Sequence, residues 1–432
     1  MLGRTTRLGD GLLIIAILLP LLIALPRLGW PGDTLGAWLG WSGRVAGILG
    51  LSMMLVTAAI SIRIPGVDRW FGGLDRLWRI HRRLGFGAFI LIMLHVLALA
   101  FAVLPVSLQA AVATLFPPLS HTALWLGWLA WLAMVVFLAP TFDFFGRLHY
   151  QRWKRLHLLS AAALVLALLH VIPLAGETGA WWLLGAAGLG AIVWRKLVSP
   201  WAARRPYRVE SVTPLARGVV ELGLRPEQRE MTYEAGQFVY LTPLDETLSA
   251  GRGEEHPYTI SSAPGDPLLR AGIKDLGDAS HALQSVAIGS RVMIEGPYGD
   301  FFRRRFPERD ALWLGGGIGI TPFVGGARDI AGHDATDGRV QLFYLANDGE
   351  RAYYLDELKQ IALDNQRIAV TAHFFRREGP MNVAFLHAHC PDFVEREVYI
   401  CGPPGMVDHL RRLLGAQGVP AARIHCEVFD FL

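Results

Sequence analysis

The spacing of apolar residues divides the chain into two parts. The first 200 residues hold nearly all the long hydrophobic runs, whereas the remainder has short runs separated by polar residues, Gly and Pro. A helix needs about 20 apolar residues to cross the hydrocarbon core of a bilayer. Six runs approach that length, near residues 11–30, 35–62, 84–104, 122–140, 156–173 and 180–195. We therefore expect an all-α bundle of six transmembrane helices.

The second part has two different patterns of apolar residues. Short alternating apolar runs with Gly and Pro turns continue to about residue 307, which predicts a small β-barrel. After that, strand-like runs such as "VQLFYLA" alternate with helix-like runs such as "YYLDELKQIAL". This alternation is typical of a Rossmann-like α/β domain with a parallel sheet. We expect a multidomain membrane protein with domains at residues 1–200, 201–307 and 308–432.

Lys and Arg mark alternate loops between the apolar runs. Loops 63–83 and 147–155 are basic, whereas loops 105–121 and 174–180 contain neither Lys nor Arg. Cytoplasmic loops are enriched in these residues. We therefore expect a protein of the bacterial inner membrane with both termini on the cytoplasmic side. The net charge of +4 belongs to this pattern and gives no reason to expect nucleic acid. The three cysteines lack metal-site spacing and are expected to be reduced thiols.

Four histidines bracket two of the predicted membrane helices. His81 and His95 lie fourteen residues apart in "HRRLGFGAFILIMLH", and His157 and His170 lie thirteen apart in "HLLSAAALVLALLH". Both helices are odd-numbered and run parallel, so His81 is level with His157 on the cytoplasmic side and His95 with His170 on the outer side. Ionisable residues within a span indicate a functional site. Because imidazole is a haem ligand, the two levels, roughly 20 Å apart, predict two bis-histidine haems.

The thirteen-residue spacing does not fit a regular helix. At about 100° per residue, fourteen residues return to nearly the same helix face, whereas thirteen leave His157 and His170 well apart in azimuth. A bulge in the fifth span or an offset between the haems would account for this. Two other interpretations stay open: histidines that contact lipid head groups, and copper or zinc held by the same imidazoles.

The stretch "HPYTISSAP" at 256–264, preceded by "AGQFVYL" at 235–241, has the residues of a flavin site. Tyr258 suits the isoalloxazine ring, Thr259 its polar edge, and His256 the phosphate or ribose. A later turn in "IKDLGDAS" offers backbone N–H groups at a helix start for the pyrophosphate. Each segment alone fits an ordinary β-turn. Together they predict an FAD site formed by His256, Pro257, Tyr258, Thr259, Lys274, Gly277 and Ser280.

The stretch "WLGGGIGITPF" at 313–323 predicts a strand, a glycine loop and a helix. Glycines let the backbone approach a dinucleotide pyrophosphate, whose charge a helix N-terminus stabilises. Another strand ends in "VYICGPPGM" at 398–406, where Cys401 could hold nicotinamide against the flavin; a core thiol is the alternative. We predict an NAD(P)H site formed by Gly315, Gly316, Gly317, Gly319, Thr321, Cys401 and Gly402.

Two features near these motifs leave choices open. The chain ends in "HCEVFDFL", where Phe429 or Phe431 could cover the flavin face or simply pack a terminal strand. In "YLANDGER", Asn347 and Asp348 favour NADH because a carboxylate suits ribose hydroxyls, whereas Arg351 could reach the 2′-phosphate of NADPH.

These motifs together resemble the ferric reductase and NADPH oxidase superfamily, in particular its bacterial NADPH-oxidase-like members. The matching features are "LDRLWRIH" before the third span, the two histidine spacings, "HPYTISSAP", "GPYG" at 296–299, "GGGIGITPF" and "CGPPGM". The resemblance implies a six-helix haem domain fused to a ferredoxin-reductase-like dehydrogenase. It also implies that His81, His95, His157 and His170 bind the iron of two b-type haems.

The resemblance further implies an oxidoreductase that moves electrons from NAD(P)H through FAD and the haems to an outer acceptor. Arg44 resembles a family arginine beside the outer haem, with snorkelling to the interface as the alternative. Leu99 stands where eukaryotic oxidases place a second outer histidine. O₂, giving superoxide, is the expected acceptor. A ferric chelate, a quinone, a periplasmic protein partner and non-enzymatic haem binding are the alternatives, and no obligate protein activator or calcium is expected.

Overall fold

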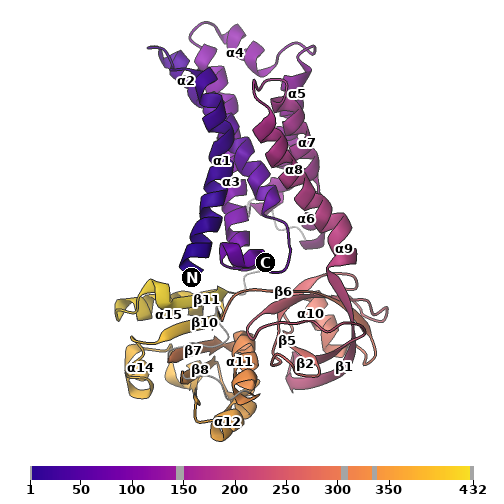
Figure 1. The fold of residues 1–432 in the computed structure, drawn as a ribbon, viewed down its shortest axis with the longest axis vertical. Coiled ribbons are helices and arrows are strands. Elements are labelled where there is room, and N and C mark those ends of the chain that lie inside the picture. The colour runs from indigo at the N-terminus through magenta and orange to yellow at the C-terminus, as the bar shows by residue number, and fades with distance from the viewer. Residues whose placement is uncertain (1, 143–149, 303–309, 333–337, 429–432) are drawn as a thin grey trace. The chain divides into compact units, whose positions relative to one another are not determined.

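A computed structural model describes residues 2–142, 150–302, 310–332 and 338–428. The chain forms two compact units, Met1–Ala202 and Ala203–Leu432. The first unit is helical (Figure 1), and a π-helical turn, Trp194–Val198, links its last two helices. Its α-helices are α1 (Leu2–Leu28), α2 (Leu35–Ala59), α3 (Leu74–Val103), α4 (Leu108–Leu115), α5 (Thr122–Leu138), α6 (Tyr150–Leu156), α7 (Leu159–Val171), α8 (Gly179–Val193) and α9 (Ser199–Ala202).

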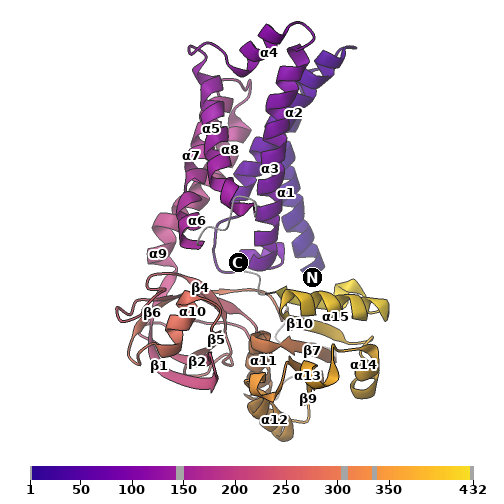
Figure 2. The same ribbon diagram turned by 180° about the vertical axis from the view of Figure 1, so that it is seen from behind.

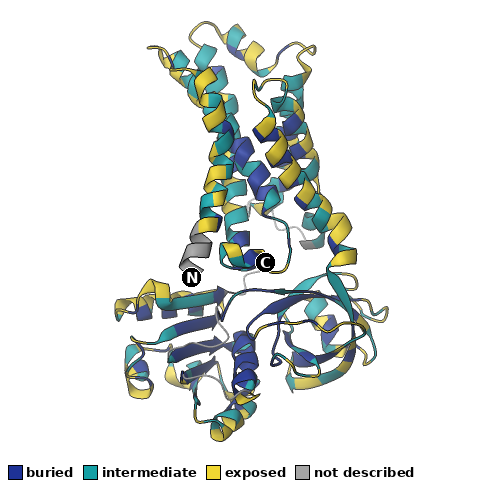
Figure 3. Cartoon of the chain, viewed as in Figure 1, coloured by how far each residue is buried: buried dark blue, intermediate teal, exposed yellow. Residues whose placement is uncertain are grey.

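Five helical segments in the described part of the chain are long and apolar enough to cross a membrane by length and composition. Large apolar side chains such as Ile15, Leu94 and Leu169 stay exposed along them (Figure 3), as expected of a lipid-facing surface. The sixth predicted run forms α8, whose 15 residues reach only about 22 Å against a core of about 30 Å. The five segments are Leu8–Leu28, Leu35–Ala59, Leu74–Val103, Thr122–Thr141 and Gln151–Val171.

Two helix pairs organise this unit: α2 packs against α3, and α5 against α7 (Figures 1 and 2). Small residues allow the first pair to approach closely. A Cβ built on Gly43 would lie 3.2 Å from the Leu99 side chain, and one on Gly50 would lie 2.8 Å from Cγ1 of Ile92. The positions of the functional side chains on α3 are therefore set by direct contact with α2.

The fifth predicted run is not one continuous α-helix. Helix α6 ends at Leu156 and α7 begins at Leu159. The turn between them has i to i−3 hydrogen bonds, from Leu158 N to the Arg155 oxygen at 3.1 Å and from Ser160 N to the His157 oxygen at 3.0 Å. Such bonds are typical of a 3₁₀ turn, which winds more tightly than an α-helix.

The second unit begins with a six-stranded antiparallel sheet in the order β4-β3-β6-β1-β2-β5. The sheet curls, and an isolated bridge joins Ile260, directly after β4, to Ala271 in β5. The expected barrel is thus observed as a curled sheet around a buried apolar core. Its elements are β1 (Arg204–Ala216), β2 (Val219–Pro226), β3 (Phe238–Pro243), β4 (His256–Thr259), β5 (Leu269–Lys274), α10 (Asp278–Ala282) and β6 (Arg291–Tyr298).

The same unit ends with a five-stranded parallel sheet in the order β11-β10-β7-β8-β9, with helices on its faces (Figure 2). The strand order reverses between β7 and β10, which makes the carboxyl ends of these strands the expected ligand crevice. The elements are β7 (Ala311–Gly316), α11 (Thr321–Gly332), β8 (Val340–Ala346), α12 (Leu355–Asp364), β9 (Ile368–Phe374), α13 (Phe375–Glu378), α14 (Val383–His389), β10 (Glu397–Gly402), α15 (Pro404–Ala416) and β11 (Ile424–Val428).

Candidate functional site

The structure brings His81 and His157 together in the helical unit. Their ring centroids lie 6.4 Å apart, with Trp78 and Phe137 packed edge-on at 5.5 Å and 5.1 Å from the respective rings. Two imidazoles that bind one metal ion from opposite sides, at about 2 Å each, have nitrogens about 4 Å apart and ring centres somewhat farther apart. The observed separation fits this arrangement.

Three of the four histidines donate Nδ1–H to a backbone carbonyl of a neighbouring helix. The distances are 2.9 Å from His81 to Thr57, 2.8 Å from His95 to Gly43 and 2.8 Å from His170 to Ala123. Such a bond fixes the tautomer and leaves Nε2 as the ligand atom. Nδ1 of His157 is buried and has no hydrogen-bond partner among the described residues. The Nε2 atoms left available by these hydrogen bonds fit haem ligation.

The two histidines of α3 are spaced like the two α2 carbonyls that they contact. His81 bonds to Thr57 and His95 to Gly43, so a spacing of fourteen residues on one antiparallel helix faces the same spacing on the other. His95 also lies within electrostatic range of His170. The His95–His170 pair therefore forms a second level, away from the His81–His157 pair.

The 3₁₀ turn at His157 accounts for part of the thirteen-residue spacing. Thirteen α-helical residues fall about 140° short of four full turns. A 3₁₀ turn advances about 120° per residue instead of 100°, so the three or four steps from His157 to Ala161 recover about 60–80° of this difference. The tightened turn thus removes about half of the azimuthal difference between His157 and His170, and the rest remains as an offset between the two rings.

The predicted flavin residues lie on β4 and β5 of the curled sheet. Tyr258 pairs with Val239 on β3, and Thr259 pairs with Phe238. The Oγ1 of Thr259 is buried without a hydrogen-bond partner among the described residues, which fits a polar ligand edge at this point. His256 lies at the start of β4, 3.4 Å from Glu254.

The segment predicted to bind the FAD pyrophosphate forms a short turn after β5. Lys274 ends β5, and Gly277 precedes the five-residue α10. The Ser280 hydroxyl accepts a bond from Leu276 N at 2.8 Å and donates to the Gly277 oxygen at 2.9 Å. Ser280 therefore stabilises the turn itself, which leaves backbone groups as the means of contacting a phosphate.

The glycine loop and the "CGPPGM" segment meet at the switch point of the parallel sheet. Gly315 on β7 pairs with Cys401 on β10. A Cβ on Gly319 would lie 2.6 Å from the Cys401 oxygen, and one on Gly316 would lie 2.3 Å from Sδ of Met406. Glycine is required at position 319 because the turn after β7 touches the backbone at the end of β10. Thr321, whose hydroxyl donates to the Ile318 oxygen at 2.6 Å, begins α11.

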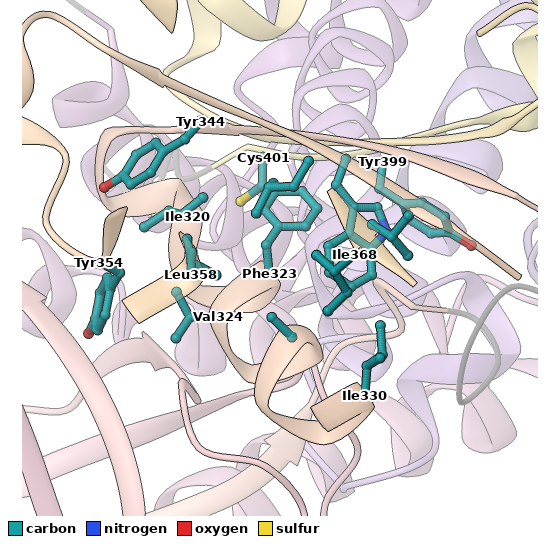
Figure 4. Close-up of a cluster of buried hydrophobic side chains, with 14 of the residues drawn as sticks. Ile320, Phe323, Val324, Ile330, Tyr344, Tyr354, Leu358, Ile368, Tyr399 and Cys401 are labelled. Atoms are coloured by element: carbon teal, nitrogen blue, oxygen red, sulfur yellow. The ribbon is translucent and has the colours of Figure 1, made fainter. Parts of the chain in front are cut away.

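Cys401 lies fully buried at the edge of an apolar cluster with Ile320 and Phe323 (Figure 4). Burial raises the pKa of its thiol well above the usual range, and the Glu427 carboxylate adds to this rise. Glu427 pairs with Cys401 across β11 and β10. The sequence prediction missed Glu427, although it lies within the quoted "HCEVFDFL".

A buried ionic network crosses the second unit and was also missed. Glu221 on β2 accepts hydrogen bonds from Ser261 (2.6 Å), Arg328 (3.0 Å) and Tyr354 (3.1 Å). Arg328, on α11, also pairs with Glu357 on α12 at 2.6 Å. Burial alone would lower the pKa of Arg328, but its bonds to Glu357 and Glu221 more than offset this and raise it. The network joins the segment after the flavin motif to the helix after the glycine loop.

Other predicted residues have less structural context. Arg44 lies on α2 with an exposed side chain, one residue after the carbonyl that accepts from His95. Leu99 contacts Gly43 at the same level. Phe429 and Phe431 lie outside the described residues. Asp348 pairs with Arg376 at 2.8 Å, next to the backbone of Arg351.

Three family profiles match the chain in succession. "Ferric reductase like transmembrane component" matches residues 46–168, "FAD-binding domain" matches 206–301, and "Oxidoreductase NAD-binding domain" matches 313–412. The first profile contains both histidines of α3, all of α5 and α7 as far as Leu168, and it ends two residues before His170. The other two contain the predicted flavin and nucleotide motifs.

Curated relatives include the glycine betaine monooxygenase reductase subunit of Pseudomonas aeruginosa, 31% identical over 210 residues, covering 46% of this chain and 56% of the relative. The propane 2-monooxygenase reductase component of Mycolicibacterium goodii is 28% identical over 238 residues, covering 51% and 66%. The chain thus spans less than two thirds of the length of these relatives. The flavohem-like FAD/NAD-binding domain of nitric oxide dioxygenase from Vibrio cholerae is 26% identical over 52% of this chain and 99% of that chain, with a TM-score of 0.47.

The order of the three matches is the same as that of the helical unit, the curled sheet and the parallel sheet. The chain is therefore an integral membrane oxidoreductase in which a ferric-reductase-like transmembrane component is fused to FAD-binding and NAD-binding domains, the domain arrangement of a ferric-reductase- or NADPH-oxidase-like fusion.

Proposed function

We propose that this chain transfers electrons from cytosolic NAD(P)H, through FAD and two bis-histidine b-type haems, to an acceptor on the outer side of a bacterial inner membrane. The observation that carries the proposal is the pairing of the His81 and His157 rings at 6.4 Å in a chain that also has FAD- and NAD-binding domains. Bound FAD and haem supply the redox chemistry. One NAD(P)H releases two electrons and one proton, so it reduces two one-electron acceptors.

Each bound group has its own residues in this proposal. His81 and His157 hold the inner haem, and His95 and His170 hold the outer haem, each through Nε2. The FAD residues are His256, Pro257, Tyr258, Thr259, Lys274, Gly277 and Ser280. The NAD(P)H residues are Gly315, Gly316, Gly317, Gly319, Thr321, Cys401 and Gly402.

The proposal includes a membrane topology and three domains. Helix α8 would complete a sixth span together with the π-helical turn and α9 that continue it. Both termini would then lie in the cytoplasm, as the distribution of Lys and Arg indicates. The domains would be residues 1–200, 201–307 and 308–432, and the division between compact units at Ala202 and Ala203 supports the first boundary.

O₂ is the acceptor that we favour, with superoxide as the product. His95 and His170 would hold the outer haem, which would supply single electrons to a nearby acceptor that does not bind the iron. Arg44 carries an exposed positive charge close in sequence to the Gly43 carbonyl that orients His95. Such a charge attracts an anionic product or a haem propionate. A ferric chelate, reduced at the same site, is the main alternative.

Oxygen uptake and ferric-chelate reduction distinguish these acceptors. With purified protein and NAD(P)H, we expect superoxide formation, and we expect apparent chelate reduction in air to fall when superoxide dismutase is added. Chelate reduction that is insensitive to dismutase and persists without oxygen would overturn the oxidase assignment in favour of a ferric reductase.

A reductase for a separate acceptor is the second candidate function. It is favoured by the relatives that are named as reductase components of monooxygenases. This candidate predicts slow turnover with both O₂ and ferric chelate, and fast turnover with a quinone or a periplasmic protein. Rapid steady-state superoxide production by the purified chain alone would exclude it.

A further inference from the structure

Each outer histidine ring lies against a glycine of the neighbouring helix. A Cβ built on Gly47 of α2 would lie 2.6 Å from Nδ1 of His95, and a Cβ built on Gly127 of α5 would lie 2.8 Å from Nδ1 of His170. Both distances are shorter than non-bonded contacts of a real side chain. Any residue other than glycine at either position would displace the imidazole.

The two glycines occupy the same position relative to the carbonyl that the ring contacts. His95 donates to the Gly43 oxygen and His170 to the Ala123 oxygen, and the glycine lies four residues later in each helix. In an α-helix the oxygen of residue i already accepts from N–H of residue i+4. A carbonyl oxygen has a second lone pair, and a glycine at i+4 leaves room for the ring to reach it.

This arrangement is specific to the outer level among the described residues. His81 contacts the Thr57 oxygen, close to the end of α2 at Ala59, so residue 61 no longer lies on the helix. Nδ1 of His157 has no hydrogen-bond partner in the part of the chain that the structure describes. The repeated unit is therefore one helix with a carbonyl and a glycine, packed against one helix with a histidine, in α2–α3 and again in α5–α7 (Figures 1 and 2).

We propose that Gly47 and Gly127 are positioning residues for the two ligands of the outer haem. They keep each Nδ1–H on its carbonyl, which fixes the ring plane and presents Nε2 to the iron. This inference rests on the proposed function, because it needs a haem between His95 and His170. A hydrogen bond to Nδ1 makes the imidazole more basic, so its loss should also raise the reduction potential of that haem.

The test uses Gly47→Ala and Gly127→Ala in the full chain, with Gly50→Ala as the matched control. Gly50 lies on the same helix as Gly47 and is similarly crowded, with a Cβ distance of 2.8 Å, but its neighbour is Ile92 rather than a histidine. The measurements are haem per chain, FAD per chain and a redox titration followed by haem absorbance. His170→Leu, which removes an outer ligand, identifies the outer potential.

We expect both glycine variants to keep FAD and the inner haem. The outer haem should be lost, so that haem falls from two to one per chain, or it should be retained with a higher potential, and the double variant should lose no further haem. The inference is overturned if both variants keep two haems at unchanged potentials, or if Gly50→Ala has the same effect. Fewer than two haems in the unaltered protein would instead contradict the proposed function.

Discussion

Asp348 is the residue on which we expect the choice between NADH and NADPH to depend. Its carboxylate pairs with Arg376 at 2.8 Å and accepts the backbone N–H of Arg351 at 3.2 Å. A carboxylate after the second strand of such a sheet suits the ribose hydroxyls of NADH. It also pairs with Arg376, a positive charge that a 2′-phosphate would otherwise attract.

Replacing Asp348 with Asn should therefore shift the preference toward NADPH. We expect the ratio of kcat/KM for NADPH to that for NADH to rise by about tenfold, which corresponds to about 1.4 kcal/mol. Steady-state kinetics with both nucleotides measures this ratio. Glu350→Gln, an exposed neighbour on the same turn, is the control and should leave it unchanged. No shift in the Asp348 variant would show that another residue sets the preference.

The three cysteines differ in burial, and thiol labelling can test whether they therefore differ in reactivity. Burial raises the pKa of Cys390 to about 12, whereas an ordinary thiol titrates near 8.5. Between pH 7 and 9 the folded protein should therefore gain no thiolate at Cys390, and Cys401 should behave alike, so neither should react with iodoacetamide. Half-buried Cys426 should react first, and all three should react after unfolding. Mass spectrometry locates the label, and rapid native labelling of Cys390 would contradict the prediction.

At the scale of elements, the Glu221 network ties β2, α11 and α12 together. Glu221→Gln would leave Arg328 buried with only one carboxylate partner, Glu357. Removing one partner of a buried ion pair costs about 3–5 kcal/mol. We expect a clearly lower melting temperature of the dehydrogenase unit in the full chain, followed by fluorescence of released FAD.

The matched control is Glu246→Gln, which removes the exposed pair between Glu246 and Arg252. Exposed ion pairs contribute little to stability, so its melting temperature should match that of the unaltered protein. Equal effects of the two substitutions would mean that the buried network has no special role in holding the elements together.

The sequence predicted the elements better than it predicted how they meet. Runs of apolar residues and Gly-rich strand ends are local, so the helices, the glycine loop after β7 and the Cys401 segment after β10 could be located in advance. The 3₁₀ turn at His157 could not, because it depends on how α6 and α7 join. Gly47, Gly127 and Glu221 have meaning only through contacts with distant residues, which no local pattern records.

At the scale of the whole molecule, one chain combines a nicotinamide- and flavin-binding unit with a helical unit that has two levels of histidines. This combination supports the proposed transfer of electrons from NAD(P)H to haems held by the histidine pairs. The levels are distinct, since His81 and His95 contact α2 carbonyls fourteen residues apart. Losing a ligand at one level should therefore leave the haem of the other level in place.

The most direct test is the absorbance spectrum of the purified, FAD-loaded protein under anaerobic conditions, before and after addition of NAD(P)H, with haem counted per chain. We predict two b-type haems per chain, both reduced by NAD(P)H, and one haem remaining when His157 or His170 is replaced by Leu. One haem or none in the unaltered protein, or haem that NAD(P)H does not reduce, would contradict electron transfer from the dehydrogenase to paired histidines.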